Sequence, residues 1–338
     1  MKAAVFHGAY DIEVTDVPVP EIGPDEVLIK VHLCGICGLD VAAYKTGMYE
    51  EGLIIGHEFA GHIVAVGEEV TDWASGERVT ANGVIPCGQC WFCHHDRPTL
   101  CDDVLMPGVS HNGAFAEFVA APAKGLHRLP DGLTDRQAAL IDPLANALHA
   151  VRLTSLQPGD RALILGAGPI GLSILQGVRL AGARAAYVTE LSLARAAVAR
   201  QLGADAVLDP RQTNLFSTLD RLTDGQGVDV VFECAGVPQT LQDAVTLARK
   251  GGEIMVIALC EEHVAFDFMT VTMNELTIRG SYCGQEEYPL TIDLLAQGRL
   301  QAEPMISHVI ALDDIVEQGF RALTQPGTEA VKVLVEIG

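Results

Sequence analysis

Four cysteines with the spacing C-x2-C-x2-C-x7-C are the residues of this sequence best suited to binding a metal. They are Cys87, Cys90, Cys93 and Cys101. Four thiolates fill the tetrahedral shell of Zn²⁺ and leave no position for water or substrate, so such a site holds a loop together. Disulfides are one alternative, but the chain has no mark of secretion. An iron–sulfur cluster is another, but the last gap is longer than in ferredoxin-type runs. The spacing therefore predicts a structural zinc site.

A glycine-rich motif that suits a dinucleotide begins at Gly166. It has the pattern G-x-G-x-x-G, with an apolar strand-like run before it and an apolar helical run after it. The first glycine permits a tight turn, the second lets the backbone approach a pyrophosphate, and the third allows close packing of helix on strand. The free N–H groups of the helix N-terminus attract the phosphates. We expect the contacts to come from Gly166, Gly168, Pro169, Ile170 and Gly171.

An acidic residue stands where the next predicted strand ends. Glu190 lies 24 residues beyond Gly166. A carboxylate there bonds the adenosine ribose hydroxyls and repels a 2′-phosphate, which favours NAD over NADP. The alternative is a solvated loop acid. Arg195, five residues further on, is a candidate cofactor contact that could soften the discrimination, or it faces solvent on the following helix.

A third group of candidate residues is scattered over the first half of the chain. Cys37 follows Cys34, the pair His57 and Glu58 follows a glycine, and Asp142 precedes a proline. A thiolate, an imidazole and carboxylates are the mixed ligands of catalytic zinc, which keeps one position open. Taken singly, the cysteines could be packed thiols and the His–Glu pair a surface or capping pair. The residue types alone leave both interpretations open.

The elements that must position these residues change in kind along the chain. Residues 1–145 contain short β-branched runs between Gly and Pro, which is typical of an all-β module. From Gly159 onward, apolar strands alternate with helical patterns, which predicts a parallel, doubly wound sheet of the α/β class. Strands are predicted at 161–165, 185–189, 228–234 and 253–259, a helix at 288–300 and a closing strand at 330–336.

The composition excludes two classes of partner. The net charge of −22 opposes binding to nucleic acid or to an anionic membrane surface. No uninterrupted apolar segment reaches the ~20 residues that a membrane span needs, and the N-terminal residues lack a signal-peptide pattern.

The chain has nine cysteines, an odd number. An odd remainder after four zinc ligands indicates reduced thiols, and we expect a cytoplasmic protein.

Together and in this order, the motifs resemble the zinc-dependent medium-chain dehydrogenase/reductase family. The resemblance covers essentially the whole chain and is greatest to the polyol branch, which contains sorbitol and butanediol dehydrogenases. It implies a GroES-like β domain with two zinc sites, formed by residues 1–145 and 283–338. It also implies a Rossmann NAD-binding domain at residues 146–282. Relatives are dimers or tetramers, so the resemblance implies a homodimer or homotetramer.

The resemblance also assigns roles to the scattered residues. Cys37 matches the thiolate ligand of the catalytic zinc, in the local form G-I-C-G-x-D. His57 and Glu58 match the G-H-E motif, which supplies the imidazole ligand and an adjoining carboxylate. Asp142 matches an acid that binds zinc directly or through its water. Asp40 matches the carboxylate that fixes the tautomer of the zinc-bound histidine. The implied reaction transfers hydride between a small secondary alcohol or polyol and NAD, with zinc as Lewis acid.

One departure from the family pattern concerns the route of the alcohol proton. Many members have Ser or Thr two residues after the ligand cysteine and His three beyond that. Here these positions are Leu39 and Ala42, which cannot carry a proton. Glu58 or Asp142 could act as the base instead, and this is the explanation we favour. Tyr44, or ribose hydroxyls with a water chain, could replace the relay. Otherwise the enzyme reduces an activated C=C or C=N bond.

Two further expectations concern residues outside the motifs. Lys332 is expected at the edge of a strand. The predicted strand at 276–282 and the preceding residues 260–273 are apolar and are the candidate subunit interface. A nucleotide-binding relative without catalysis is the remaining alternative, but the retention of Cys37, His57, Glu58 and Asp142 argues against it.

Overall fold

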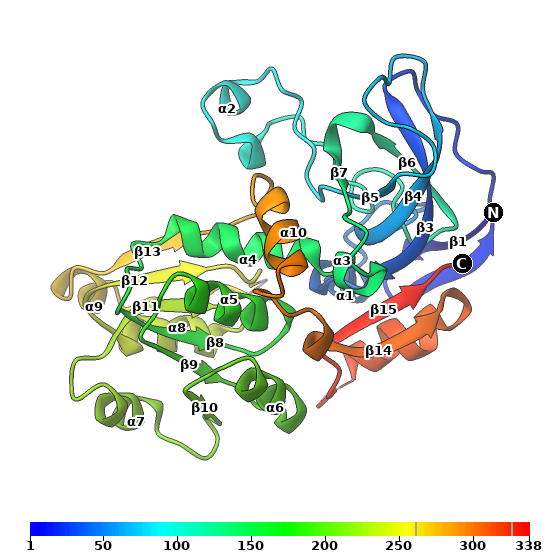
Figure 1. The fold of residues 1–338 in the computed structure, drawn as a ribbon. Coiled ribbons are helices and arrows are strands. Elements are labelled where there is room, and N and C mark those ends of the chain that lie inside the picture. Colours follow the sequence, from blue (N-terminus) through cyan, green and yellow to red (C-terminus); the bar gives the residue numbers. More distant parts are fainter. Residues whose placement is uncertain (261, 326) are drawn as a thin grey trace. The chain divides into compact units, whose positions relative to one another are not determined.

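The chain folds into two compact units in a computed structural model that describes residues 1–260, 262–325 and 327–338 (Figure 1). Unit 1 consists of Met1–Asp142 and Tyr288–Gly338, and unit 2 consists of Pro143–Glu287. The chain therefore leaves unit 1 after Asp142 and returns to it at Tyr288.

Unit 1 is built on β-sheets. A two-stranded antiparallel sheet pairs β1 (Lys2–Gly8) with β2 (Asp11–Asp16). A mixed seven-stranded sheet has the order β14 (Ile306–Ala311), β15 (Lys332–Glu336), β3 (Glu26–Gly35), β4 (Glu58–Val66), β5 (Arg78–Ala81) and β7 (Leu126–Arg128), and β6 (Phe118–Pro122) also pairs with β3. Val27, Ile29 and Val31 alternate along β3 and are fully buried, which is the pattern of a strand with one face on the core.

Short helices connect these strands. They are α1 (Gly38–Thr46), α2 (Trp91–His94), α3 (Asp135–Ala138), α10 (Tyr288–Ala296), α11 (Ala322–Thr324), a π-helical segment (Ile315–Arg321) and 3-10 turns at Pro98–Leu100, Ala123–Gly125, Glu303–Met305 and Leu312–Asp314. Helix α4 (Ile141–Leu153) begins at the last residues of the first segment of unit 1 and continues into unit 2.

Unit 2 is the parallel, doubly wound sheet that the alternation of strands and helices predicts, so the predicted fold class is confirmed. The sheet has the order β10 (Ala206–Leu208), β9 (Ala185–Thr189), β8 (Arg161–Leu165), β11 (Val228–Glu233), β12 (Ala248–Val256) and β13 (Thr277–Gly280), with all pairs parallel. Its helices are α5 (Pro169–Leu180), α6 (Leu193–Gln201), α7 (Leu215–Leu222), α8 (Pro238–Leu247) and α9 (Phe268–Met273).

The strand order of unit 2 reverses between β8 and β11. In open α/β sheets, ligands bind at such a switch point, outside the carboxyl ends of the strands. All residues of β8 and β9 are buried, as expected for parallel strands covered on both faces. Their predicted bounds are exact. By contrast, β12 begins at Ala248 instead of 253, because the three residues after Ala248 are Arg, Lys and Gly, which are exposed and give no apolar signal.

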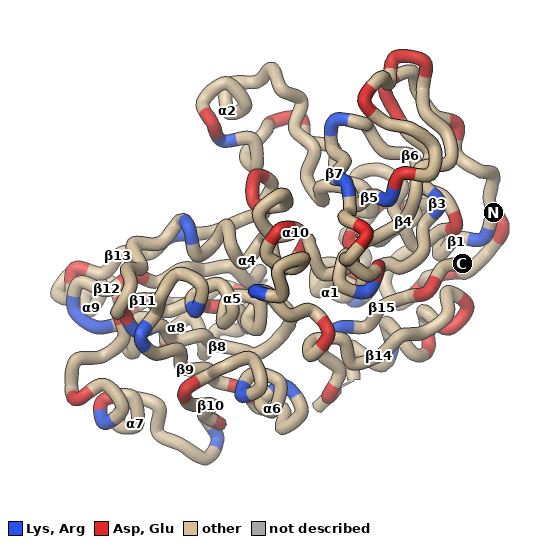
Figure 2. Tube along the Cα trace, in the orientation of Figure 1, with Lys and Arg blue, Asp and Glu red and all other residues tan. Residues whose placement is uncertain are grey.

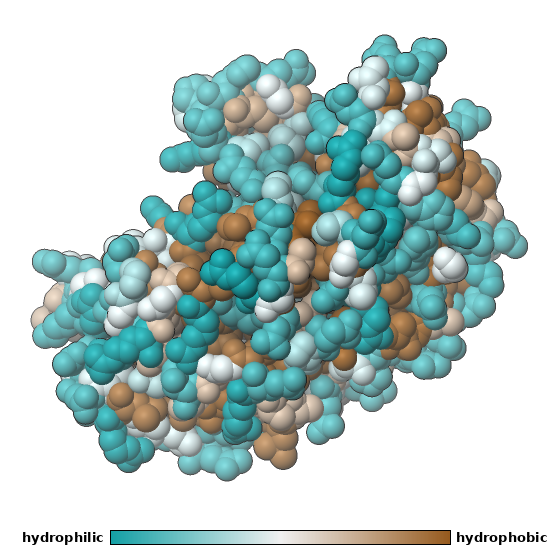
Figure 3. All heavy atoms as spheres, in the orientation of Figure 1, coloured by the Kyte–Doolittle hydropathy of each residue, from teal (hydrophilic) through white to brown (hydrophobic). Residues whose placement is uncertain are grey.

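The surface agrees with the acidic composition. Figure 2 shows Asp and Glu distributed over both units with Lys and Arg interspersed. On the face drawn in Figure 3, hydrophilic side chains predominate and apolar side chains occur in separate places. Among the described residues, the longest helices are too short or too polar to cross a membrane.

Candidate functional site

The four cysteines of the sequence motif lie together. The sulfur atoms of Cys87, Cys90, Cys93 and Cys101 are within 4.8 Å of one another. Sγ of Cys90 is 3.5 Å from that of Cys93 and 3.7 Å from that of Cys101, whereas a disulfide requires about 2.05 Å. Backbone N–H groups, Cys93 first, lower the pKa of the Cys90 thiol to about 6, which favours the thiolate. This geometry suits one ion inside four sulfurs.

The segment that carries these cysteines has almost no core of its own. No residue of α2 or of the following 3-10 turn is buried, and Trp91 is exposed. Hydrophobic burial therefore cannot hold this loop in its fold. A metal bound by four thiolates would do so, since its binding free energy is also folding free energy.

The second group of possible metal ligands consists of Cys37, His57 and Glu58, whose ligand atoms also lie within 4.8 Å of one another. Cys37 precedes α1 directly and is its N-cap residue. His57 directly precedes β4 and Glu58 is its first residue, and β4 pairs with β3 so that Glu58 faces Gly35. The strand register thus brings together two segments twenty residues apart in sequence.

Asp40 connects the first two of these residues. Its Oδ2 accepts a hydrogen bond from the Cys37 N–H at 3.0 Å, and its Oδ1 is 3.8 Å from Nδ1 of His57. Within the described residues, that Oδ1 and that Nδ1 are buried and have no hydrogen-bond partner. A carboxylate behind the imidazole fixes its tautomer and leaves the other ring nitrogen for a metal. The carboxylate lies beside the imidazole, but 3.8 Å is beyond hydrogen-bond distance, so the role of Asp40 in fixing the tautomer stays a prediction.

Burial of this group favours the presence of a cation. Burial raises the pKa of the Cys37 thiol and raises that of Asp40 to about 6. Burial opposes protonation of His57, but the charges of Asp40 and Cys37 outweigh it and raise its pKa well above the usual value. Several acidic groups thus share a desolvated space, and a divalent ion among them would stabilise their charged forms. The sulfur, nitrogen and oxygen donors fit zinc.

Glu58 has a partner that the sequence did not indicate. The Lys332 ammonium donates to Glu58 Oε2 and, at 3.0 Å, to the carbonyl of Ile36. The prediction that Lys332 lies at a strand edge is wrong, because β15 has a neighbour on each side and this side chain is 1% exposed. Burial lowers its pKa, but Glu58 and Cys37 more than offset that effect and raise it. The sequence did contain a signal for this ion pair, because Lys332 stands within an apolar run. A lysine buried with such a run needs an acidic partner.

Asp142 lies in the first turn of α4 and is buried. Its charge interacts with His57 and Glu58, although it is not one of the three residues whose ligand atoms lie within 4.8 Å. Its Oδ1 accepts a hydrogen bond from the Tyr288 hydroxyl at 2.5 Å. Burial raises the pKa of this carboxyl group. Unit 1 alone thus brings together all of the scattered candidates.

The positions of the missing proton relay lie on α1. Leu39 packs partly against the hydrophobic core, and Ala42 is half-buried. Tyr44, a possible substitute, is buried against Tyr10 and Phe320, with ring centroids 5.2 and 5.1 Å away. Its hydroxyl interacts with the Arg321 guanidinium. The aromatic core around Tyr44 does not support a role in proton transfer.

The glycine-rich motif forms the turn between β8 and α5. Gly166 has φ +100°, which favours glycine. A side chain at Gly171 would lie 1.9 Å from the Gly166 carbonyl oxygen, so these two glycines are required by the turn itself. At Gly168, the N-cap of α5, the position of a Cβ has no atom within 4 Å from any part of the described chain beyond the turn itself. This open space beside a helix N-terminus can receive a diphosphate, with Pro169 and Ile170 in the first turn.

Glu190 follows β9 and is held beside the glycine turn. Its Oε2 accepts from the Ala167 N–H at 2.9 Å, and its Oε1 accepts from the N–H groups of Leu191 and Ser192 at 2.7 and 2.8 Å. Arg195 is half-buried in the first turn of α6. Sequence reasoning missed Arg211, which follows β10. Its guanidinium donates a hydrogen bond to the Leu191 carbonyl, and the donor and acceptor atoms are 2.7 Å apart. It lies 20 residues from Leu191 in sequence, so no local motif marks it.

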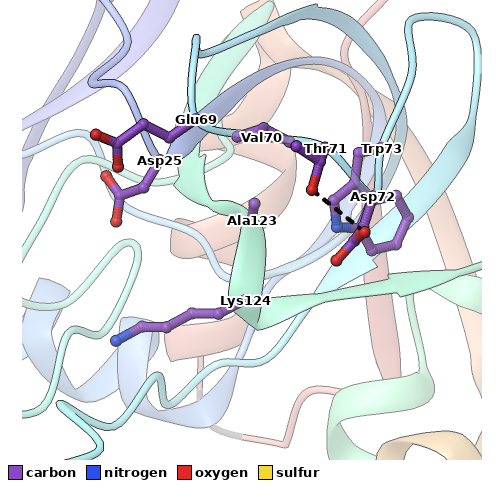
Figure 4. A pocket seen from close by; sticks show the side chains of 8 residues that line it. All are labelled: Asp25, Glu69, Val70, Thr71, Asp72, Trp73, Ala123 and Lys124. Atoms are coloured by element: carbon purple, nitrogen blue, oxygen red, sulfur yellow. Dashed lines mark hydrogen bonds between the residues drawn. The ribbon is translucent and has the colours of Figure 1, made fainter.

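A separate acidic pocket in unit 1 lacks the chemistry of these sites. Figure 4 shows the carboxylates of Asp25 and Glu69 near each other, with Thr71 and Asp72 on the opposite side. The Arg128 guanidinium already covers the Trp73 ring at 4.1 Å. None of the residues in the two groups of possible metal ligands lines this pocket.

Two family models match the chain. Residues 23–131 match the alcohol dehydrogenase GroES-like domain, and residues 169–297 match the zinc-binding dehydrogenase model. A sorbitol dehydrogenase of Bacillus subtilis (strain 168) is 34% identical over 99% of this chain and 97% of its own. An L-threonine 3-dehydrogenase of Aeromonas hydrophila is 35% identical over 96% of each chain.

A solved structure gives the same result. A protein of Sinorhizobium meliloti 1021, described as a zinc-binding dehydrogenase and bound to NADP, superposes with a TM-score of 0.93 at 34% identity, over 99% of this chain and 98% of that one. The sequence identity of 34% extends over both units, so the two proteins share more than the fold. The chain therefore belongs to the zinc-dependent medium-chain dehydrogenase/reductase family, whose members are oxidoreductases of the alcohol and polyol dehydrogenase type.

Proposed function

We propose that this protein is an NAD-linked dehydrogenase that oxidises a small secondary alcohol or polyol and reduces the ketone in the reverse direction. The observation that carries the proposal is the buried group of Cys37, His57 and Glu58, with ligand atoms within 4.8 Å of one another. We assign the catalytic zinc to this group, with Asp142 as a ligand directly or through water. We assign a second, structural zinc to the four cysteines of residues 87–101.

Bound zinc would supply a Lewis acid for the alcohol oxygen, and bound NAD would supply the hydride acceptor. The residues of the chain have separate tasks. Cys37 and His57 hold the metal, and Asp40 orients the His57 ring from 3.8 Å. Lys332 compensates the charge of Glu58 in the desolvated site. Gly168 leaves the space in which the diphosphate meets the N-terminus of α5.

The named substrates of relatives narrow the class of alcohol. Sorbitol and L-threonine are the substrates in the names of two relatives at 34% and 35% identity. Each contains a secondary hydroxyl beside a second hydroxyl or an amino group. We therefore expect a small secondary alcohol with a polar group on the neighbouring carbon.

A screen of zinc-loaded protein against diols, polyols, inositols and amino alcohols tests this function, with NADH formation as the readout. Oxidation of at least one vicinal diol or amino alcohol is the expected result. Leu39 and Ala42 favour a second candidate, a reductase of an activated C=C or C=N bond. Failure with every alcohol, together with NADH-dependent reduction of an activated alkene or iminium, would establish that second reaction instead.

We propose that Asp142 accepts the alcohol proton, because Glu58 is already committed to Lys332. Asp142→Asn retains the shape of the side chain but removes its basicity. We expect hydride transfer to slow by ~10²-fold or more in this variant and by less in Glu58→Gln. Single-turnover formation of NADH measures this step. Equal rates in Asp142→Asn and the unchanged protein would exclude Asp142 as the base.

The choice of cofactor is assigned to Glu190. Its carboxylate, held beside the glycine turn at 2.9 Å from the Ala167 amide, would bond the ribose hydroxyls and repel a 2′-phosphate. Glu190→Ser is expected to reduce the preference for NAD over NADP by roughly 10-fold or more, since a hydrogen bond to a charged group is lost. Ratios of kcat/KM for the two cofactors measure it. Tighter binding of NADPH than of NADH by the unchanged protein would refute the assignment. This outcome is a real alternative, because the structure of one relative was solved with NADP.

We propose that β13 joins two copies of the chain. It is an edge strand of the sheet in unit 2, and all four of its residues are exposed. On the nearby helix α9, Phe268, Met269 and Met273 are 69%, 69% and 74% exposed. Residue 261 of the predicted interface segment lies outside the described residues. An edge strand beside exposed apolar side chains is a surface for strand pairing, and a closed symmetric oligomer is the common result.

Light scattering tests this interface. The unchanged protein is expected at a multiple of the 35.9 kDa chain. Ile278→Lys places a charge on the exposed edge and should shift the protein toward the monomer. Lys250→Glu, on the exposed part of β12, serves as a surface control that should leave the mass unchanged. A single monomeric species of the unchanged protein at every concentration would contradict the proposal.

A further inference from the structure

The Tyr288 hydroxyl lies between a candidate metal ligand and a backbone amide. It donates to Oδ1 of Asp142 at 2.5 Å and accepts from the Gly83 N–H at 3.0 Å. The Tyr288 side chain is fully buried. Both a donor and an acceptor site of the phenol are therefore used, and the direction of the O–H toward the carboxyl group follows from the amide on its other side.

The ring of Tyr288 makes a second set of contacts. The His127 ring stacks on it, with centroids 5.1 Å apart and planes 26° apart. Nε2 of His127 is in turn 2.9 Å from Oδ1 of Asn82. Burial lowers the pKa of His127 to about 4, so a neutral imidazole supports the phenol at pH 7. Residues from β7 and from the end of β5 thus orient a residue of α10.

Gly83 also lies close to the carboxyl group of Asp142. A Cβ at Gly83 would lie 2.8 Å from Oδ1 of Asp142 and 3.8 Å from Cδ2 of His57. Oδ1 of Asp142 is therefore bonded by the Tyr288 hydroxyl and also borders the space that a side chain at residue 83 would fill. The same glycine borders the imidazole that is a candidate metal ligand.

The hydrogen bond between Tyr288 and Asp142 also joins the two points at which the chain crosses between units. Asp142 is the last residue of the first segment of unit 1, and Tyr288 is the first residue of the returning segment. The two residues are 146 positions apart in sequence. Their contact lies wholly within unit 1, so it orients Asp142 independently of unit 2.

We propose that Tyr288 is a positioning residue for Asp142 in the catalytic zinc site. Its hydroxyl holds one carboxyl oxygen in place without introducing a charge, whereas Glu58 is held by a charged ammonium. The carboxyl group of Asp142 thereby keeps a single orientation toward His57 and the metal. This inference rests on the proposed function. Partners that orient a ligating carboxylate contribute roughly 10- to 100-fold to metal affinity or activity.

Tyr288→Phe is the direct test, because it keeps the ring on His127 and removes only the hydroxyl. In protein loaded with Co²⁺ in place of zinc, we expect altered visible absorption bands, since these report the ligand geometry of the metal. We also expect kcat to fall by roughly 10-fold or more, with a much smaller change in KM for NAD. Tyr187→Phe is the matched control, because Tyr187 is a buried tyrosine of unit 2 whose hydroxyl bonds the Leu222 carbonyl. It should leave the cobalt spectrum unchanged.

Gly83→Ala provides a second variant in which the Tyr288 hydroxyl is retained. The added methyl group would lie 2.8 Å from Oδ1 of Asp142 and displace the carboxyl group, so the cobalt bands should change here as well. A cobalt spectrum and kcat equal to those of the unchanged protein in Tyr288→Phe would overturn the inference and reduce Tyr288 to a packing residue. That result leaves the proposed function intact. The proposed function fails separately, and the inference with it, if the unchanged protein binds no metal outside the four cysteines.

Discussion

Cys37→Ser is expected to remove one of two bound zinc ions and to lower turnover by at least ~10³-fold, because the metal contributes several kcal/mol to the transition state. Cys37 belongs to the buried group with His57 and Glu58, and a serine hydroxyl is a poor replacement for a thiolate ligand. The fold should persist, because Cys37 lies at the N-cap of α1 and contributes only its backbone N–H to the hydrogen bond with the Asp40 carboxylate. Elemental analysis and NADH formation measure the two effects.

Two other cysteines serve as controls for this prediction. Cys34→Ala changes a buried thiol three residues away that belongs to neither cysteine group, so two zinc ions and near-normal turnover are expected. Cys90→Ser should remove the other ion and impair folding, since its loop has no buried residue in α2. Two zinc ions and full turnover in Cys37→Ser would show that the group does not bind the catalytic metal.

Lys332→Met is expected to destabilise the metal-free protein by about 3–5 kcal/mol, because it leaves the carboxylate of Glu58 buried without its cation. Glu58 and Lys332 are 2% and 1% exposed, so solvent screens their interaction weakly. Bound zinc places another positive charge beside Glu58. The same substitution should therefore cost less in the zinc-loaded protein, and its zinc affinity should not fall. Urea unfolding with and without chelator measures the difference.

The double variant Lys332→Met/Glu58→Gln separates the ion pair from packing. Removing both charges should recover part of the stability lost in Lys332→Met, because no unpaired charge remains buried. Lys250→Met, at an exposed lysine, should stay within about 0.5 kcal/mol of the unchanged protein. If Lys332→Met and the double variant are equally unstable, the loss comes from packing of β15 and the buried charge is not its cause.

Local spacing in the sequence was sufficient for the features whose parts are close along the chain. Cys87–Cys101 spans one loop, and the turn from β8 through Gly171 into α5 is a single supersecondary unit. Backbone geometry restricts such short segments to few conformations, so residue types at fixed offsets predict their three-dimensional arrangement. The alternation of strands and helices predicted the doubly wound sheet for the same reason.

The wider site depended on family resemblance, because its ligands come from segments with no fixed offset. Cys37 and Asp142 could be named before the structure was known only because motifs of a known family occur in the same order. Neither periodicity nor composition marks one aspartate among 44 acidic residues as buried beside a histidine. Their roles as metal ligands remain predictions that the zinc measurements above address.

Only the tertiary structure decided which groups support those ligands. Lys332 meets Glu58 across 274 positions because β15 pairs with β3, and Tyr288 meets Asp142 across 146 positions because the chain returns to unit 1 at that residue. Arg211 reaches the loop after Glu190 for a similar reason, since β10 is placed beside β9. Such contacts depend on which strands pair in the folded protein. The sequence between two partner residues does not indicate that they will lie close together. The ligand types were therefore readable from the sequence, whereas their charge compensation and orientation arise from the packing of distant strands.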